Sequence, residues 1–398
     1  MKEKLIKLIV IVCVLLFIVT PLLMWLAWKY SEKKKIDIFI LDKTVLNRTY
    51  QEHLSFNWVL NNNRFVKTNG HNFLPGNDYY GFFPDERGGY DIYDLESKSN
   101  KELEQLSYDY DMVYYIDLYG IYWAEWHSEY PYIKPEQSPF KVGERSELLY
   151  GGLTENELEF LKLMKAQKKL IINEFNIIAS PTSYDLRKKY EKEFDINWSG
   201  WTGRYFASLD TNINKELPVW LVRNYKEQNN KQWPFKKSGI AFVRNDDKIV
   251  ILENQTHLKY EIPMIITNSD YLELYDLPRV IKYSFWFDIC STGPKNDVIS
   301  EYHILSNNKG DSILEKWNIP KDFPAVIKSN QDYPYFYFAG DFADNPISMR
   351  TSHYKYIKVF DFLFYKSVIN ERKSFFWLYY RPLLTKILKD YYKTISPK

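Results

Sequence analysis

The sequence predicts an α/β fold with a mainly parallel sheet, flanking helices and one preceding transmembrane helix. Two observations predict the sheet: short apolar runs recur along the chain, and a helical pattern follows each of the early ones. Such alternation is typical of parallel strands joined by helices on both faces of a sheet. The third observation is an uncharged apolar stretch near the start. We therefore expect a membrane anchor over 1–35, a globular α/β domain over 36–350 and a helical tail over 351–398.

The uncharged stretch covers residues 8–28, which is long enough to cross the hydrocarbon core of a bilayer as a helix. It ends in aromatic residues and lysines rather than at a small-residue cleavage site, which favours a membrane anchor over a cleaved signal peptide. Lysines flank both ends, so the charge count leaves the orientation open. Because a short basic amino-terminal segment usually stays inside, we expect a single-pass protein of the cell membrane with its globular part on the extracytoplasmic side.

Three short apolar runs are the predicted central strands. They cover 38–41, 113–116 and 170–172. A helix is predicted after the first run from apolar spacing over 50–60, and another before the third run, where Thr154 and Glu157 form a capping box. The polar, glycine-rich segment 67–100 is expected to be a long loop or a small excursion near the top of the sheet. These features predict that the three runs are adjacent or near-adjacent buried strands with their carboxyl ends on one edge.

The later chain reads as strands and loops, with a helical tail. Residues 239–253 predict a hairpin with its turn at 245–247. The aromatic run 335–338 predicts a further strand. A stripe of apolar residues over 383–392, opposite lysines, predicts an amphipathic helix that packs on the protein or lies on the membrane.

Acidic and amide side chains follow four of the predicted strands: Asp42, Asp117, Glu174, Asn176 and Asp341. In open sheets of this class, ligands bind outside the carboxyl ends of the strands, so we expect these side chains to converge. Glu174 and Asp341 are the candidate catalytic acid and base, and the other three are candidate substrate-binding residues. Asp and Asn also cap turns at strand ends, which is the structural alternative for each residue.

The segment GDFADN after the aromatic run suggests a division of roles. Gly340 is expected to let the chain turn sharply, so that Asp341 points into the same crevice as Glu174. Asp344 and Asn345 are expected to cap the following turn.

A second candidate group lies in the stretch NWSGWTGRYF. Trp198 and Trp201 offer faces that stack on sugar rings, and Arg204 offers a guanidinium that holds an acidic group. The two tryptophans could equally pack in the core on either side of a turn. If this is a site, all three residues are substrate-binding.

The order of the apolar runs, the capped helix, the hairpin and the late strand resembles the class I glutamine amidotransferase-like group of flavodoxin-like folds. Members with amidotransferase activity place a nucleophilic cysteine in a tight turn after a central strand. Here the comparable turn after Ile172 reads NEFN, and Cys290 stands in a different context. The resemblance therefore implies an amidotransferase-like fold in a divergent relative that lacks the nucleophilic cysteine.

Other functional classes find little support. A formal net charge of +2 does not indicate a nucleic-acid partner. The histidines show no zinc-binding spacing, and no glycine-rich phosphate loop is present, so we expect neither a metal nor a cofactor. What remains is a membrane-anchored envelope protein that binds or processes a polysaccharide through a crevice lined by carboxylates and aromatic rings.

The alternative is a catalytically silent amidotransferase-like scaffold with protein partners in an envelope or transport assembly. The two functions differ in one structural expectation. A saccharide site requires the acids and the tryptophans to face one cleft, whereas a scaffold allows them to lie on separate faces.

Overall fold

The computed structural model describes residues 2–132, 146–363 and 368–396. Within them, a ten-stranded sheet forms the centre of the molecule. In sheet order its strands are β14 (Val280–Lys282), β13 (Met264–Thr267), β16 (Asn296–His303), β17 (Asp322–Ser329), β18 (Tyr335–Phe338), β9 (Leu170–Asn173), β6 (Met112–Tyr115), β2 (Ile38–Asp42), β4 (Tyr80–Pro84) and β5 (Tyr90–Tyr93).

A four-stranded antiparallel sheet lies beside it. In order its strands are β12 (Ile249–Glu253), β11 (Gly239–Arg244), β10 (Ile196–Phe206) and β15 (Trp286–Thr292). Two small pairs complete the described strands: β1 (Lys34–Lys35) with β3 (Phe65–Val66), and β7 (Ile121–Tyr122) with β8 (Leu148–Tyr150). An isolated bridge between Phe287 of β15 and Gly340 joins the two large sheets, so the end of β18 meets the smaller sheet.

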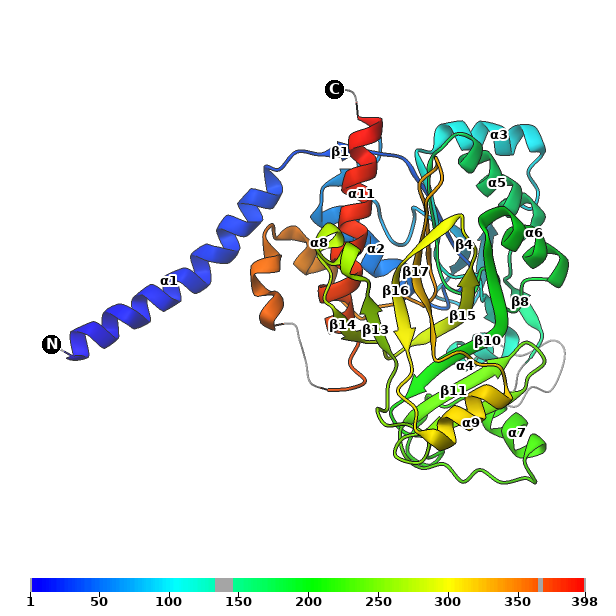
Figure 1. Cartoon of the computed structure of the whole chain (residues 1–398). Coiled ribbons are helices and arrows are strands. Elements are labelled where there is room, and N and C mark those ends of the chain that lie inside the picture. The colour runs from blue at the N-terminus through cyan, green and yellow to red at the C-terminus, as the bar shows by residue number, and fades with distance from the viewer. Residues whose placement is uncertain (1, 133–145, 364–367, 397–398) are drawn as a thin grey trace.

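The helices lie around these sheets, except α1, which extends away from them (Figure 1). They are α1 (Lys2–Lys29), α2 (Gln51–Asn62), α3 (Asn100–Asp109), α4 (Trp123–Glu129), α5 (Glu155–Ala166), α6 (Tyr184–Phe194), α7 (Val219–Gln228), α8 (Ser269–Tyr275), α9 (Asn308–Lys316), α10 (Lys373–Phe375) and α11 (Arg381–Ile395). Short helical turns cover Met349–His353, Ile357–Leu363 and Phe376–Tyr380.

The three predicted central strands are neighbours. β6 lies between β2 and β9, and both pairings are parallel: Val113 is opposite Phe39 on one side and Ile171 on the other. All three strands are buried along their length, as continuous apolar runs in parallel sheets should be. The predicted capping box of Thr154 and Glu157 is present at the start of α5.

The prediction of a mainly parallel sheet is wrong, because the large sheet is mixed. β18, β9, β6, β2 and β4 pair in parallel, whereas both flanks of the sheet are antiparallel. The physical reason is the length of the connections. β17 and β18 are joined by a short loop, and so are β4 and β5, and such loops reverse the chain, while a parallel pair needs a long crossover.

The segment 67–100 also differs from the prediction of a long loop. It contains β4 and β5, which form one edge of the large sheet. Gly81 explains why a glycine-rich segment can pair there: its φ is 129°, and a side chain at this position would collide with the backbone of Asp42. The glycine therefore allows β4 to approach β2 closely.

The transmembrane part of the predicted fold class is also corrected. Across the residues that the structure describes, no helix combines the length and apolar character needed to cross a membrane. The helix α1 covers the predicted span, contains Pro21 and projects away from the rest of the molecule (Figure 1). Within that span, the side chains of residues 8–13 and Phe17 lie outside the described set. The orientation and the cell-membrane location stay predictions.

The helical tail packs on the globular part. α11 runs beside α2 and α8 (Figure 1), and its apolar stripe is buried. The buried side chains of this stripe are Leu383, Leu384, Ile387, Leu388 and Tyr391. The Tyr391 hydroxyl donates a hydrogen bond of 2.6 Å to the carbonyl of Asp111, directly before β6. Of the two predicted positions for this helix, the structure shows packing on the protein.

Candidate functional site

A cavity of about 320 Å³ lies between the carboxyl ends of the central strands and the four-stranded sheet; we name it the main cavity because five of the predicted site residues line it, not because of its size. Its wall combines acidic, aromatic and hydrogen-bonding side chains. The acidic residues are Glu52, Asp117, Glu125, Asp341 and Asp344; the aromatic ones are Tyr119, Phe175, Trp198, Trp220, Phe285 and Trp286; the remaining polar ones are Thr44, Asn176, Ser180, Thr202, Arg204, Arg244 and Asn245.

Five of the eight residues predicted from the sequence line this cavity. They are Asp117, Asn176, Trp198, Arg204 and Asp341. The strands β6, β9 and β18 place the acids and the amide at one edge, as predicted for the carboxyl ends of a parallel sheet. The other three, Asp42, Glu174 and Trp201, are buried and are not among the lining residues.

Asp341 follows β18 and points into the main cavity without a side-chain hydrogen bond to any described residue. Burial, together with the nearby Asp344 and Asp117, raises the pKa of this carboxyl well above its ordinary value. The preceding Gly340 does not adopt a positive φ, so the turn does not need a glycine for its backbone conformation. It needs the space, because a side chain there would collide with the Tyr302 hydroxyl.

Asp117 follows β6 and is nearly fully buried at the edge of the main cavity. Its Oδ1 accepts a hydrogen bond of 2.7 Å from the backbone N–H of Tyr119. Burial and the nearby Asp42 raise its pKa well above the ordinary value, although the hydrogen bond opposes this shift. Asp117 and Asp341 therefore both favour the protonated form more strongly than an exposed aspartate does.

Glu174 is fully buried and anchors the turn that carries Asp341. It accepts hydrogen bonds from the Tyr114 hydroxyl and from the backbone N–H of Ala343, the latter at 2.6 Å. Burial raises the pKa of Glu174 well above its ordinary value. The geometry makes this carboxyl a support for the turn, and its predicted catalytic role stays a prediction.

Asp344 and Asn345 were both predicted to cap the turn, but their side chains have different partners. The Asn345 amide donates to the carbonyl of Phe342 at 2.5 Å and so closes the turn. Asp344 instead forms an ion pair of 3.3 Å with Arg372, a residue distant in sequence. The second acid therefore links the turn to the carboxyl-terminal part of the chain.

Asp42 contacts His53, a residue that the sequence patterns did not indicate as part of the site. Its Oδ2 lies 2.7 Å from Nδ1 of His53, and Nε2 of the same ring lies 2.8 Å from the carbonyl of Pro75. Since a carbonyl only accepts, the contact with Pro75 requires a proton on Nε2. Both side chains are fully buried, so Asp42 and His53 form a buried polar pair.

Glu52 is a second residue near the site that the sequence patterns did not indicate. It lines the main cavity, and its Oε2 atom is buried without a hydrogen-bond partner among the described residues. Burial and the nearby Asp42 raise its pKa well above the ordinary value. Its position in the first turn of α2 gives no sequence signal, because acidic residues are common at helix starts.

The two predicted tryptophans of β10 have different surroundings. Trp198, Thr202 and Arg204 line the main cavity, whereas Trp201 does not, and the pairing of β10 with β15 is irregular between Trp198 and Thr202. Trp201 packs edge-on against Trp317 at 6.3 Å. Trp201 therefore packs in the core. Trp198 and Arg204 line the main cavity and stay candidate ligand-binding residues.

No group of three or more His, Cys, Asp or Glu side chains suited to a metal ion is found within the described ranges. Cys290 is buried, and burial raises the pKa of its thiol well above the ordinary value, which is unfavourable for a nucleophile.

Comparisons with known proteins found similarity in structure but not in sequence. No family model matches the chain, and none of the curated proteins matches it. Among solved structures, a ThuA-like protein from Bacteroides uniformis ATCC 8492 aligns with a TM-score of 0.36 and 8% identity over 81% of this chain and 90% of its own. A ThuA-like protein from Parabacteroides merdae ATCC 43184 aligns with a TM-score of 0.33 and 12% identity over 77% and 79%.

ThuA-like proteins have a class I glutamine amidotransferase-like fold, which is the resemblance drawn from the sequence. At these TM-scores the likeness carries no argument about the site or its chemistry, and the predicted loss of the nucleophilic cysteine is not tested by it.

Proposed function

We propose that the chain binds a polysaccharide in the main cavity and that Asp341 acts there as a proton donor. The observation that carries this proposal is the convergence of carboxyl groups and aromatic faces on one cavity. Sugar rings present apolar faces that stack on aromatic rings and hydroxyl groups that bind carboxyl and amide groups. The cavity wall offers both kinds of partner.

The acid chemistry follows from the pKa of Asp341. A carboxyl group with a raised pKa keeps its proton at a higher pH and can donate it to a sugar oxygen. Glu174 supports this role indirectly, because its hydrogen bond to the Ala343 N–H holds the turn in place. Asp341 is therefore the better candidate for contact with a ligand.

The scaffold alternative is less favoured by the geometry. It allows the acids and aromatic residues to lie on separate faces, whereas five of the eight predicted residues line one cavity. Two of the three other residues are buried acids near the cavity wall. In addition to burial, Asp42 raises the pKa of Glu52, and Glu174 raises the pKa of Asp341.

A glycan array probed with the full-length chain tests the proposal, and saccharides that bind are then titrated against variants. Asp341→Asn should weaken binding or turnover about tenfold or more with little change in melting temperature, because this side chain has no described hydrogen bond to lose. Asp344→Ala should lower stability by about 1 kcal/mol, because it loses its bond to Arg372.

Asp91→Asn provides the control, since Asp91 is an exposed residue of β5 outside the main cavity. It should leave both binding and melting unchanged. An array with no bound saccharide would refute the proposed function. Binding that survives Asp341→Asn unchanged would remove Asp341 from the site.

A further inference from the structure

A second, smaller cavity adjoins the main cavity. This side cavity has a volume of about 150 Å³ and shares Arg204 and Phe285 with the main one. Arg372 also lines it, together with Ser284, Asn214 and Asn370. The two arginines come from β10 and from the segment before α10, so the sequence does not place them together.

Both guanidinium groups lie close to one ring. The Cζ atom of Arg204 is 5.0 Å from the centre of the Phe285 ring, and that of Arg372 is 3.8 Å from the same centre. Each guanidinium has one carboxylate partner, Glu216 for Arg204 and Asp344 for Arg372. Burial is the main cause that lowers the pKa of Arg204, and the charge of Arg372 adds to it, while Glu216 opposes it. A further anion beside the two arginines would favour their charged forms.

Arg204 has hydrogen-bonding capacity left for such an anion. Its Nε atom is buried and has no hydrogen-bond partner in the described part of the chain. Its Nη2 atom donates to Glu216 at 2.7 Å, but the Glu216 side chain is 76% exposed. A carboxylate on so exposed a side chain is weakly held, and it occupies the position that the carboxylate of a ligand would take.

We propose that the side cavity binds the anionic substituent of an acidic saccharide whose ring lies in the main cavity. The inference rests on the proposed function and names its substrate class. Arg204 and Arg372 hold the anion, since a guanidinium binds a carboxylate or sulfate ester through paired N–H donors. Phe285, shared by both cavities, lies at the passage between ring and substituent. Glu216 is displaced when the ligand binds.

The test uses small probes that differ in charge. Full-length protein is titrated with D-glucuronate, with its uncharged methyl ester, with glucose 6-sulfate and with inorganic sulfate, at constant ionic strength. Tryptophan fluorescence reports binding, because Trp286 and Trp220 line the main cavity. We expect either charged sugar to bind at least about tenfold more tightly than the ester, and sulfate to compete with it. The two charged sugars distinguish a carboxylate site from a sulfate site.

Variants locate the effect. Arg372→Gln should remove the preference for the charged sugars over the ester. Glu216→Gln should strengthen binding of the charged sugars, because the competing carboxylate is gone. Arg350→Gln is the matched control: Arg350 is exposed and lines neither cavity, so the preference should persist.

The outcomes separate the two proposals. Equal binding of ester and charged sugars refutes the anion site while the saccharide site stands. Binding of sulfate that is lost in Arg372→Gln, without binding of any sugar, supports the anion site and refutes the saccharide site. No binding of any probe refutes both, and a preference that survives Arg372→Gln assigns the anion to other residues and refutes this inference.

Discussion

At the scale of single residues, Asp288 links protonation to folding. This fully buried carboxyl accepts hydrogen bonds of 3.0 Å from the Asn176 N–H and of 3.1 Å from the hydroxyls of Thr202 and Tyr337. These partners belong to three different segments around the main cavity. Burial raises the pKa of Asp288 from 3.8 to about 6, despite the opposing effect of its hydrogen bonds.

The raised pKa of Asp288 makes the free energy of unfolding depend on pH. Between pH 3.8 and about 6 the folded state binds more protons at Asp288 than the unfolded state, so the free energy of unfolding falls as pH rises through this range. The stability from this group is complete below the unfolded pKa and is lost above the folded one. The Asp288→Asn variant has no group that titrates at this position. Over the same range, its free energy of unfolding should therefore fall by about 3 kcal/mol less than that of the wild type.

Urea unfolding at several values between pH 4 and pH 7 measures this difference. Asp91→Asn serves as the exposed control and should follow the wild-type pH dependence. Parallel curves for Asp288→Asn and wild type would show that Asp288 has an ordinary pKa in the folded protein.

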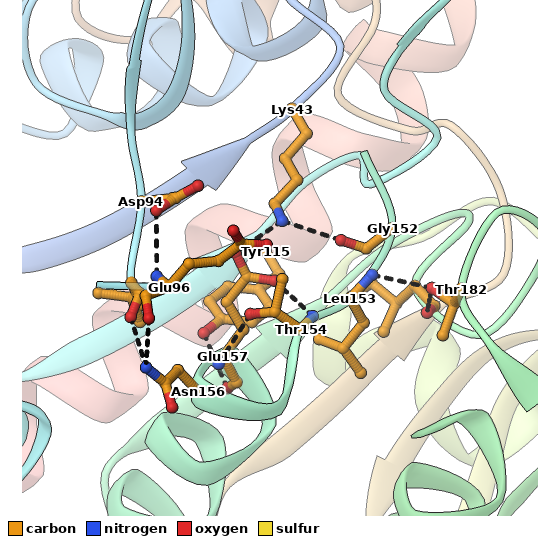
Figure 2. Close-up of polar contacts among 12 residues, drawn as sticks. Lys43, Asp94, Glu96, Tyr115, Gly152, Leu153, Thr154, Asn156, Glu157 and Thr182 are labelled. Carbon is orange, nitrogen blue, oxygen red and sulfur yellow. Dashed lines mark hydrogen bonds and ion pairs between the residues drawn. The ribbon is translucent and has the colours of Figure 1, made fainter. Parts of the chain in front are cut away.

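At the scale of elements, a buried ion pair joins β2 to α5. Nζ of Lys43, directly after β2, lies 2.8 Å from Oε1 of Glu157 and donates to the carbonyl of Gly152 at 2.8 Å. Figure 2 shows these contacts beside the capping box, in which Glu157 accepts from the Thr154 N–H at 2.9 Å. Both charged side chains are completely buried. One ion pair thus fixes the helix start against the strand end that precedes the site.

Breaking this pair on one side should be costly. Lys43→Met leaves Glu157 charged and buried without its partner, which costs about 3–5 kcal/mol. The double variant Lys43→Met with Glu157→Gln should recover part of that loss, because no buried charge remains and glutamine can keep the capping box. Denaturant unfolding of the three proteins measures the effect.

An exposed pair provides the comparison. Lys168 and Asp332 form an ion pair of 2.7 Å with side chains 62% and 76% exposed. Lys168→Met should therefore destabilise the fold far less than Lys43→Met does. Equal losses at the two lysines would contradict the importance assigned to the buried pair.

At the scale of the whole molecule, the carboxyl-terminal segment completes the core. Tyr379 and Tyr380 are fully buried, and the hydroxyls of Tyr380 and Tyr114 lie 3.0 Å apart. Tyr114 in turn donates to Glu174, which supports the turn of Asp341. The last helix is therefore connected by hydrogen bonds to the candidate site.

Removal of residues 371–398 should abolish cooperative unfolding, because it exposes the apolar side chains that pack against α11. Circular dichroism during thermal denaturation checks this. Truncation after Lys393 retains the buried stripe of α11 and should melt close to the full-length protein. A cooperative transition in the larger deletion would show that the core forms without the tail.

Local patterns were sufficient for much of the fold. The capping box of α5, the hairpin of β11 and β12, and the amphipathic helix α11 each depend on residues close in sequence, and each is present. The parallel centre followed from apolar runs separated by helices. Thr182 shows the limit of this reasoning. It lies just before α6, where threonines often cap a helix, but its hydroxyl accepts from the Leu153 N–H at 2.9 Å (Figure 2).

The sequence by itself determined that acids follow the central strands and that aromatic residues and an arginine accompany them. Only the tertiary structure decided which side chains reach a cavity: Trp198 of β10 lines the main cavity and Trp201 does not, while Glu52 and Arg372 arrive from distant segments. The reason is physical. Helices, caps and strands follow from neighbouring residues, whereas the wall of a cavity depends on contacts between segments far apart in the chain, for which a single sequence contains no periodic signal.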